Sequence, residues 1–316
     1  MRRLAGRLHK AGKQIGMVPT MGALHEGHLS LMRVARKKAD AVVVSIFVNP
    51  TQFGPTEDFR QYPRDPKGDK ERCRKAGVDI LFMPPRSQIY TKDHSTFVTT
   101  GRLTEVLCGP FRPGHFRGVA TVVTKLFNIV RPHLAFFGQK DYQQALVIRQ
   151  MVKDLHLDVK IVTVPTVRDP DGLAASSRNV YLSAQERQAA RVLYQSLQMG
   201  REMILGGERE ALRIRSQLEV YIKKELVNLW GPVRLVGAQF IAPKSGVINH
   251  APTDAPTPQA RSGQARPSPY ARIEYVSICD PQTLQEVQKI EGKTLIALAV
   301  WIGKNRLIDN LIVRKH

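Results

Sequence analysis

Cysteine is scarce in this chain of 316 residues, and long apolar runs are absent from it. The three cysteines, Cys73, Cys108 and Cys279, are odd in number and too widely spaced for a zinc site or a redox pair. This pattern indicates a protein of the reducing cytoplasm that folds without disulfides. The two longest apolar runs, residues 41–48 and 295–302, are far shorter than the ~20 residues that a membrane helix needs. We therefore expect no membrane partner.

Acidic residues are also few: 48 lysines and arginines against 27 aspartates and glutamates give a net charge of +21. The first 38 residues hold nine basic residues and a single acid, Glu26. Such a surplus would attract RNA, an anionic surface or a polyanionic substrate such as a nucleotide. No aromatic-interleaved or RNP-like motif accompanies the charge, so a solvated basic surface is the favoured interpretation and a nucleic-acid partner is not expected.

The basic segment at residues 1–13 has two interpretations. Its composition fits a fragment of a transit peptide. The apolar stretch at residues 15–19, however, is typical of a first core strand and leaves little room for a removable leader. We therefore expect a surface helix that precedes this strand.

Several common catalytic motifs are absent. The phosphate loops G-x-x-x-x-G-K-S/T and G-x-G-x-x-G do not occur, and neither does the nucleophile motif G-x-S-x-G. Residues 25–28 read His-Glu-Gly-His, but a zinc-protease helix needs H-E-x-x-H, whose histidines converge on the metal from one helix face. Here the histidines are three positions apart, a glycine lies between them, and no third ligand follows. The spacing disfavours a zinc site.

Short β-branched runs alternate with helical patterns in the first half of the chain. The continuous apolar run at residues 41–48 is typical of a strand buried on both faces of a parallel sheet. Strands are predicted at residues 15–19, 41–48, 78–82, 134–137 and 159–164, and helices at 28–38, 69–76, 119–130 and 143–155. This order predicts an α/β fold with a Rossmann-like doubly wound parallel sheet, which binds ligands at the carboxyl ends of its strands.

The pattern changes after Pro165. Ser183 and Glu186 form a capping-box pair that predicts a helix over residues 183–197. A further helix is predicted at 208–226, and strands at 273–278, 294–302 and 307–313. We therefore predict a Rossmann-like domain over residues 1–166 and a smaller C-terminal α+β domain over residues 167–316.

A proline-rich stretch interrupts this second domain near residues 242–271. Between Ala251 and Tyr270 it holds five prolines and four alanines, with almost no apolar bulk. Such a composition cannot build a packed core, so we expect a disordered or loosely packed insertion without a catalytic role.

The position of the His-Glu-Gly-His segment favours an anion site. It follows the first predicted strand and opens the first helix, whose N-terminus presents free N–H groups. Gly22 and Gly27 allow a ligand to approach the backbone, and two imidazoles can donate hydrogen bonds to phosphate oxygens. A single histidine at a helix start would more simply be a cap or a surface residue. Two of them after a strand favour a phosphate site.

The stretch PTMGALHEGH at residues 19–28 resembles the HIGH-type signature of class I nucleotidyltransferases and aminoacyl-tRNA synthetases. The particular residues of this stretch are similar to those of one family, the pantothenate synthetases or pantoate–β-alanine ligases. Five further stretches support this narrower resemblance. They are SIFVNPTQF (45–53), YPR (62–64), GHFRGVATVVTK (114–125), FFGQKDYQQ (136–144) and RLIDN (306–310). Residues 164–182 resemble the family's counterpart of the KMSKS loop, which would make the C-terminal domain a lid. Taken in order, these stretches extend the resemblance over nearly the whole chain except the insertion.

The resemblance implies an ATP-dependent condensation of pantoate with β-alanine through a pantoyl adenylate, with release of AMP and pyrophosphate. This chemistry requires positioning and charge stabilisation and no protein nucleophile. The resemblance also implies ATP and Mg²⁺ at the site and a homodimer. A related nucleotidyltransferase with a different acceptor is the alternative, and a basic RNA-binding protein that reuses the fold is a third hypothesis.

The same motifs imply roles for individual residues. His25 and His28 would bind the ATP phosphates, with His28 as the preferred proton donor, and Lys140 would neutralise them. Arg178, on a mobile loop, would contact the terminal phosphates. The implied catalytic residues are thus His25, His28, Lys140 and Arg178. The implied ATP-binding residues are Met21, Gly22, Ala23, Leu24, His25, Glu26, Gly27, His28, Gly138, Gln139, Lys140, Asp141, Val167, Ala175, Ser176, Ser177 and Arg178.

Neutral amides are the implied contacts of the other substrates. Gln52 and Gln144 would hold pantoate through its hydroxyls and carboxylate, and Asn49 and Phe47 would shape the same pocket that also receives β-alanine. The basic loop of Arg112 and His115 suits an anionic ligand as well.

Two positions depart from the family pattern. Asp69 matches an acidic metal contact, but Lys67 and Gly68 precede it where the family often has further acids. Ala175 stands where the family often has methionine, before Ser-Ser-Arg.

Overall fold

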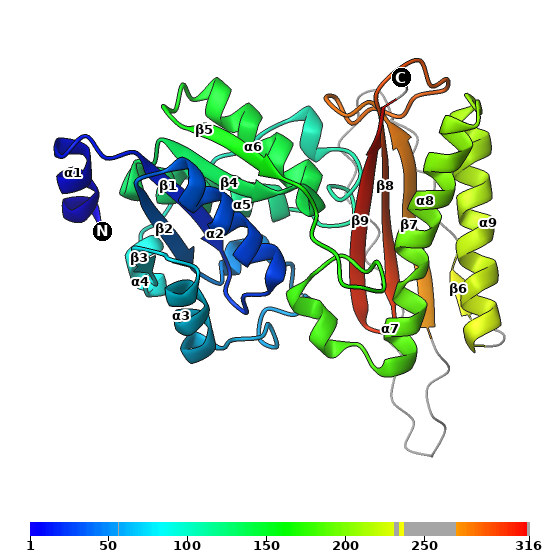
Figure 1. The fold of residues 1–316 in the computed structure, drawn as a ribbon, viewed down its shortest axis with the longest axis horizontal. Helices are drawn as coiled ribbons and strands as arrows, with labels where there is room; N and C mark the ends of the chain where they lie inside the picture. The colour runs from blue at the N-terminus through cyan, green and yellow to red at the C-terminus, as the bar shows by residue number, and fades with distance from the viewer. Residues whose placement is uncertain (56, 231–233, 237–269, 315–316) are drawn as a thin grey trace.

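A computed structural model describes residues 1–55, 57–230, 234–236 and 270–314 of the chain. Two β-sheets organise these residues, and Figure 1 shows them side by side with helices packed around them. The first sheet comes from residues 15–164 of the chain, and the second sheet comes from residues 234–313.

The first sheet holds five parallel strands in the order β3-β2-β1-β4-β5. These strands are β1 (Ile15–Thr20), β2 (Ala41–Ile46), β3 (Ile80–Phe82), β4 (Leu134–Gly138) and β5 (Lys160–Val164). One face is covered by α2 (Glu26–Lys38) and α3 (Pro66–Lys75), and the other by α1 (Arg2–Lys10), α5 (His115–Val130) and α6 (Tyr142–Asp154). The predicted Rossmann-like doubly wound sheet is confirmed.

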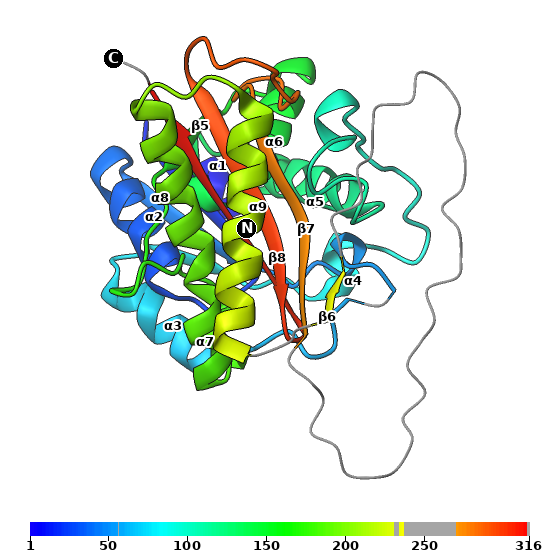
Figure 2. The same cartoon turned by 90° about the vertical axis from the view of Figure 1, so that its right-hand side faces the viewer.

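The second sheet has the order β6-β7-β8-β9, with β6 parallel to β7 and the other pairs antiparallel. Its strands are β6 (Arg234–Val236), β7 (Tyr270–Cys279), β8 (Thr294–Ile302) and β9 (Asn305–Val313). After α7 (Ala184–Ala190), helices α8 (Val192–Leu205) and α9 (Ala211–Trp230) cover one face of this sheet, as Figure 2 shows. Leu295 and Ala297 of β8 belong to a separate apolar cluster that includes Tyr142 and Leu146 of α6. The C-terminal α+β part is therefore confirmed and packs against the first sheet's helices.

Several other expectations can be compared with the structure. The basic N-terminus forms α1, and Ser183 and Glu186 form the predicted capping box at α7. The domain boundary between residues 166 and 167 follows the end of β5 and stays a prediction. The proline-rich insertion lies outside the described residues, apart from Tyr270 and Ala271, which begin β7. None of the helices in the described ranges has the length and apolarity to cross a membrane.

Some element boundaries differ from the prediction. The helix predicted over residues 183–197 is two helices, because the chain tightens at Arg191, whose N–H donates to the carbonyl of Gln188 three residues back. The helix predicted from residue 119 begins at His115, directly after Gly114 in the left-handed region. Helix α4 (Arg86–Ile89) and strand β6 were not predicted, since such short elements carry no readable periodicity.

A close contact joins α5 to the short 3₁₀ helix η1 (Pro50–Gln52). A Cβ on Gly118 would lie 2.3 Å from the carbonyl oxygen of Thr51, so only glycine allows this approach. The Asn49 side chain completes the contact by donating to the Gly118 carbonyl at 3.0 Å. The packing of α5 therefore fixes the position of η1 and of Gln52 at its end.

We expect Gly118→Ala to lower the free energy of unfolding by about 1–3 kcal/mol, because the added methyl group forces α5 and η1 apart. Gly6→Ala in α1 is the matched control, since its Cβ would meet nothing within 4 Å. This control should be neutral or stabilising by up to about 1 kcal/mol. Chemical denaturation of both variants measures the difference, and equal stabilities would contradict the packing argument.

Candidate active site

A cleft lies at the carboxyl ends of β1, β4 and β5, where the parallel sheet meets the C-terminal part. Strands β1 and β4 are neighbours, yet α2 follows β1 on one face and α6 follows β4 on the other. This is the point of an open α/β sheet at which ligands bind. Four valine and leucine side chains of α5 line the apolar wall of the cleft: Val119, Val122, Val123 and Leu126.

Most of the sequence-predicted site residues line this one cleft. They are Met21, His25, Gly27, His28, Phe47, Gln52, Gly138, Lys140, Asp141, Gln144, Val167, Ala175, Ser176, Ser177 and Arg178. The structure thus brings together residues from five separate stretches of the chain. Thr20, Tyr62 and Thr166 line the cleft as well. Each lies in a stretch that carried the family resemblance, but none was assigned a role, because a hydroxyl group alone does not indicate a ligand contact.

The remaining predicted residues do not line the cleft. Leu24 is in the core between α2 and the sheet, and Glu26 turns outward to pair with Arg33. Asn49 is buried beneath η1. Four others, Gly22, Ala23, Gln139 and Asp69, lie in or against the turns that carry the histidines and Lys140.

The two histidines cap the start of α2. His25 is the N-cap, and its Nδ1 accepts the N–H of Gly27 at 3.2 Å. His28 reaches back, and its Nδ1 accepts the N–H of His25 at 3.3 Å. The ring centroids are 4.1 Å apart. A neutral imidazole that accepts at Nδ1 carries its proton at Nε2. Each ring therefore offers one N–H donor that the backbone does not use.

Both imidazoles are neutral near pH 7. Burial, with a smaller contribution from the positive charge of Lys140, lowers the pKa of His25 from 6.5 to about 4. Burial also lowers the pKa of His28 well below its ordinary value, and the nearby His25 and Lys140 add to the effect. The rings are thus hydrogen-bond donors without charge, and the positive charge beside them belongs to Lys140.

Lys140 belongs to the 3₁₀ turn η3 (Gln139–Asp141) at the end of β4. Its Nζ lies 3.6 Å from the carboxylate of Asp141. The side chain of Asn310 on β9 donates to the carbonyls of Gln139 and Lys140, at 3.0 and 2.8 Å. The RLIDN motif contributed to the family resemblance without a role of its own. The structure shows that it fixes the turn that carries Lys140.

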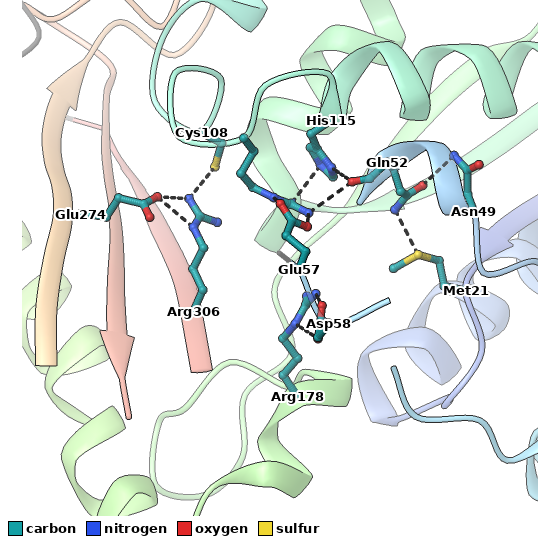
Figure 3. A network of polar contacts seen from close by, with 11 residues as sticks. Met21, Asn49, Gln52, Glu57, Asp58, Cys108, His115, Arg178, Glu274 and Arg306 are labelled. Atoms are coloured by element: carbon teal, nitrogen blue, oxygen red, sulfur yellow. Dashed lines mark hydrogen bonds and ion pairs between the residues drawn. The ribbon is translucent and has the colours of Figure 1, made fainter. Parts of the chain in front are cut away.

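The Ser-Ser-Arg segment lies above the cleft, at the start of η4 (Ser177–Tyr181). Arg178 makes a bidentate ion pair with Asp58, which Figure 3 shows. Its Nε donates to Oδ2 at 2.9 Å, and its Nη2 donates to Oδ1 at 2.8 Å. Its Nη1 has no partner among the described residues. Tyr62 and Ser177 share a hydrogen bond of 3.1 Å between their hydroxyls. The segment that carries Asp58 and Tyr62 therefore holds this loop in place.

A polar network supports Gln52 from behind (Figure 3). Its side chain accepts from Asn49 and donates to the sulfur of Met21, and its backbone carbonyl accepts from His115 Nδ1 at 2.8 Å. Arg112 donates to the other nitrogen of His115 at 3.1 Å. Burial lowers the pKa of His115 to about 3, and the charge of Arg112 adds to this effect.

Arg112 and His115 were expected to face an anionic ligand, but neither lines the cleft. Arg112 is paired with Glu57, and both side chains hold η1 in place. Their contribution is to position Gln52.

Asp69 does not occupy the position expected of a metal ligand. Its side chain is 2% exposed and outside the cleft, and its two oxygens accept the N–H groups of Ala23 and Leu24 at 2.8 Å each. Within the described ranges, no group of three or more histidine, cysteine, aspartate or glutamate side chains could hold a metal ion. Asp69 therefore does not fit the role of a Mg²⁺ ligand, because both of its oxygens are already bound to backbone N–H groups.

The fold and the cleft together define an α/β protein with a histidine-capped helix start at the switch point of its parallel sheet. The family model for pantoate-beta-alanine ligase matches residues 1–312, and the chain belongs to this family of ligases. The family resemblance predicted from the sequence motifs is confirmed.

Relatives of similar length support this membership. The chain is 48% identical to the pantothenate synthetase of Moorella thermoacetica over 99% of the chain and 95% of the relative. It is 52% identical to that of Heliobacterium modesticaldum, over 96% of the chain and 93% of the relative.

Solved structures resemble the whole fold. Pantothenate synthetase from Thermus thermophilus superposes with a TM-score of 0.78 at 39% identity, covering 97% of this chain and 96% of the other. The pantoate-beta-alanine ligase of Francisella tularensis, solved with beta-gamma ATP and beta-alanine, gives a TM-score of 0.68 at 31% identity. It covers 98% of this chain and 95% of the other.

We expect nitrogen-15 NMR of the histidine rings to show His25 and His28 as neutral Nε2–H tautomers from about pH 8 down to about pH 5. His25 should titrate near pH 4. The urea-unfolded chain is the control, in which both rings should titrate near 6.5. An Nδ1–H tautomer, or an ordinary pKa for both rings in the folded protein, would contradict the geometry.

The same shift has a consequence for stability. The unfolded chain binds more protons than the folded one between the folded pKa of His25, about 4, and its ordinary value of 6.5. Protonation of His25 therefore favours the unfolded chain, and the free energy of unfolding decreases as the pH falls from 6.5 to about 4.

Proposed function

We propose that the protein catalyses the ATP-dependent condensation of pantoate with β-alanine through a pantoyl adenylate, with AMP and pyrophosphate as the other products. One observation carries the proposal. A single cleft gathers the histidine-capped start of α2, Lys140, the Ser-Ser-Arg loop and the amides of Gln52 and Gln144. The relative from Francisella tularensis, solved with beta-gamma ATP and beta-alanine, supports ATP as a substrate.

In the first step, a carboxylate oxygen of pantoate attacks the α-phosphorus of ATP. The bond from that phosphorus to the bridging oxygen breaks, and pyrophosphate leaves. Both reactants are anions, so the site must offset their repulsion. Lys140 supplies a cation at the end of β4, and Arg178, whose Nη1 lies outside the pair with Asp58, supplies another across the cleft.

The histidines act in this proposal as neutral donors. An imidazole with a pKa of about 4 keeps its Nε2 proton near pH 7 and has no second proton to release. His25 and His28 would therefore donate hydrogen bonds to phosphate oxygens as charge develops there. The resemblance implied that His28 is a proton donor. Its low pKa supports donation of a hydrogen bond without transfer of the proton.

In the second step, the amine of β-alanine attacks the acyl carbon of the adenylate. The bond from the acyl carbon to the AMP oxygen breaks, AMP leaves, and the amine loses a proton to solvent. No side chain needs to form a covalent bond, so correct placement of the substrates is the main requirement.

The other wall of the cleft suits pantoate, which carries hydroxyl groups, a carboxylate and geminal methyl groups. Gln52 and Gln144 offer neutral donors and acceptors, and the apolar side chains of α5 lie beside them. Mg²⁺ would enter with ATP, because in nucleotide sites this ion is held largely by the substrate phosphates and water. The homodimer and the cytoplasmic location that the sequence suggests remain predictions.

Labelled pantoate tests the reaction. With oxygen-18 in the pantoate carboxylate, AMP should gain a single labelled oxygen, because that carboxylate oxygen stays on phosphorus when the acyl–oxygen bond breaks. Pyrophosphate–ATP exchange should need pantoate and should not need β-alanine. AMP release that does not require both acids, or unlabelled AMP, would rule the adenylate route out.

The loss of His28 tests the phosphate site. We expect His28→Ala to lower pantoate-dependent pyrophosphate–ATP exchange by roughly 10²–10³-fold, the usual effect of removing one donor to a developing oxyanion. Far-UV circular dichroism should stay unchanged. His156→Asn is the control, because His156 is exposed, does not line the cleft and has a left-handed φ of 49° that asparagine accepts. Wild-type exchange by His28→Ala would refute the assigned role.

A further inference from the structure

A buried carboxylate holds the turn between β1 and α2 from below. Asp69, in the first turn of α3, accepts the N–H of Ala23 through Oδ2 and that of Leu24 through Oδ1, at 2.8 Å each. Arg72 lies 3.3 Å from Oδ1 and is the neighbouring cation. The contact joins two helix starts that are more than forty positions apart in the sequence.

The backbone of this turn is strained. Gly22 has φ 84° and Ala23 has φ 49°, both in the left-handed region, where the Cβ of alanine approaches the backbone too closely. The N–H groups of Ala23 and Leu24 both point to one side of this turn, and the carboxylate of Asp69 occupies the concavity between them. A Cβ at Gly22 would lie 3.0 Å from Asp69 Oδ2, so glycine there keeps space for the carboxylate. The two hydrogen bonds to the carboxylate thus offset the conformational strain of the left-handed backbone at Ala23.

We propose that Asp69 is a positioning residue for His25 and His28: its carboxylate fills the concavity of the β1–α2 turn and fixes the loop that carries both rings. Leu24 directly precedes the N-cap His25, so the orientation of the turn sets where α2 begins. Asp69 itself lies outside the cleft and acts only through the two histidines. The catalytic part of this inference rests on the proposed function, while the ordering of the loop does not.

A role as a Mg²⁺ ligand does not fit this geometry. Mg²⁺ requires oxygen ligands at roughly 2.0–2.1 Å in octahedral arrangement and keeps several waters. The buried carboxylate would have to give up the N–H groups of Ala23 and Leu24 to provide them. It would also have to leave Arg72, which already offsets its charge.

Asp69→Asn is the first test, because it keeps the shape of the side chain but turns one acceptor into a donor that faces an N–H group. Amide hydrogen exchange at Ala23 and Leu24 should become about 10- to 100-fold faster, as expected for the loss of a hydrogen bond to a buried charge. The value of kcat/KM for ATP should fall about 10-fold or more, and the Mg²⁺ concentration for half-maximal activity should not change. Unchanged exchange at both amides, or a raised Mg²⁺ requirement with unchanged exchange, would overturn the inference.

A compensating variant separates positioning from a general loss of stability. Glycine takes the left-handed conformation without cost, so adding Ala23→Gly to Asp69→Asn should restore part of the lost protection at Leu24 and part of the activity. No recovery in either measurement would overturn the inference. Asp65→Asn is the matched control, since Asp65 caps the same helix through Gly68 but does not touch the turn. This control should leave exchange at Ala23 and Leu24 unchanged, and faster exchange there would overturn the inference.

Gly22→Ala is the second variant if Asp69→Asn does not fold. Its methyl group meets the Asp69 carboxylate and the Ile46 side chain, so exchange at Ala23 and Leu24 should again accelerate, and unchanged exchange would overturn the inference. The exchange measurements need no substrate. Faster exchange in a protein that proves to lack pantoate-dependent activity would therefore refute the proposed function and leave the role of Asp69 in the loop intact.

Discussion

The contacts of Asp309 and Asn310 on β9 hold the two sides of the cleft in one arrangement. Asp309 is buried and makes a bidentate ion pair with Arg168, which lies at the base of the Ser-Ser-Arg loop. Asn310 donates hydrogen bonds to the turn that carries Lys140. Burial raises the pKa of Asp309, and the pairing with Arg168 opposes that rise. A buried ion pair of this kind contributes little net stability but disfavours other arrangements, because a broken pair leaves an uncompensated charge. Two adjacent residues of the C-terminal sheet thus fix both cationic segments of the site.

Acidic side chains pair with three arginines in or beside the cleft, although the chain as a whole is strongly basic. Arg112 is paired with Glu57. Arg178 is paired with Asp58, and Arg306 with Glu274 beside Cys108, as Figure 3 shows. Carboxylates in these positions hold the guanidinium groups in fixed orientations before a ligand arrives, which reduces the entropy lost on binding. Because Nη1 of Arg178 is not used in the pair with Asp58, this nitrogen could donate to a phosphate oxygen while the ion pair stays intact. The net charge therefore says little about the site, where local pairs decide which cations remain available.

The sequence predicted the elements and the cleft more fully than it predicted side-chain roles. Strand–helix alternation and buried apolar runs depend on local periodicity, and the ends of parallel strands necessarily meet at one edge of the sheet. The roles of Asp69, Arg112 and His115 depend instead on contacts with residues 45 to 63 positions away, and no local pattern encodes these. Each of the three resembled a ligand contact in the sequence, and each instead contacts a backbone segment whose side chains line the cleft.

The short spacing of the His-Glu-Gly-His segment follows from helix capping. An N-cap residue and the third residue of the helix can each reach the other's backbone, which is the geometry of a capping box. His28 accepts the N–H of His25 only because it occupies that third position, and a histidine one position later would lie a further ~100° around the helix with its Nδ1 unpaired. Gly27 is equally constrained, since a Cβ there would lie 2.9 Å from the His25 ring. The separation that disfavours a zinc site is therefore the one that fixes both tautomers and leaves two neutral N–H donors at the start of α2.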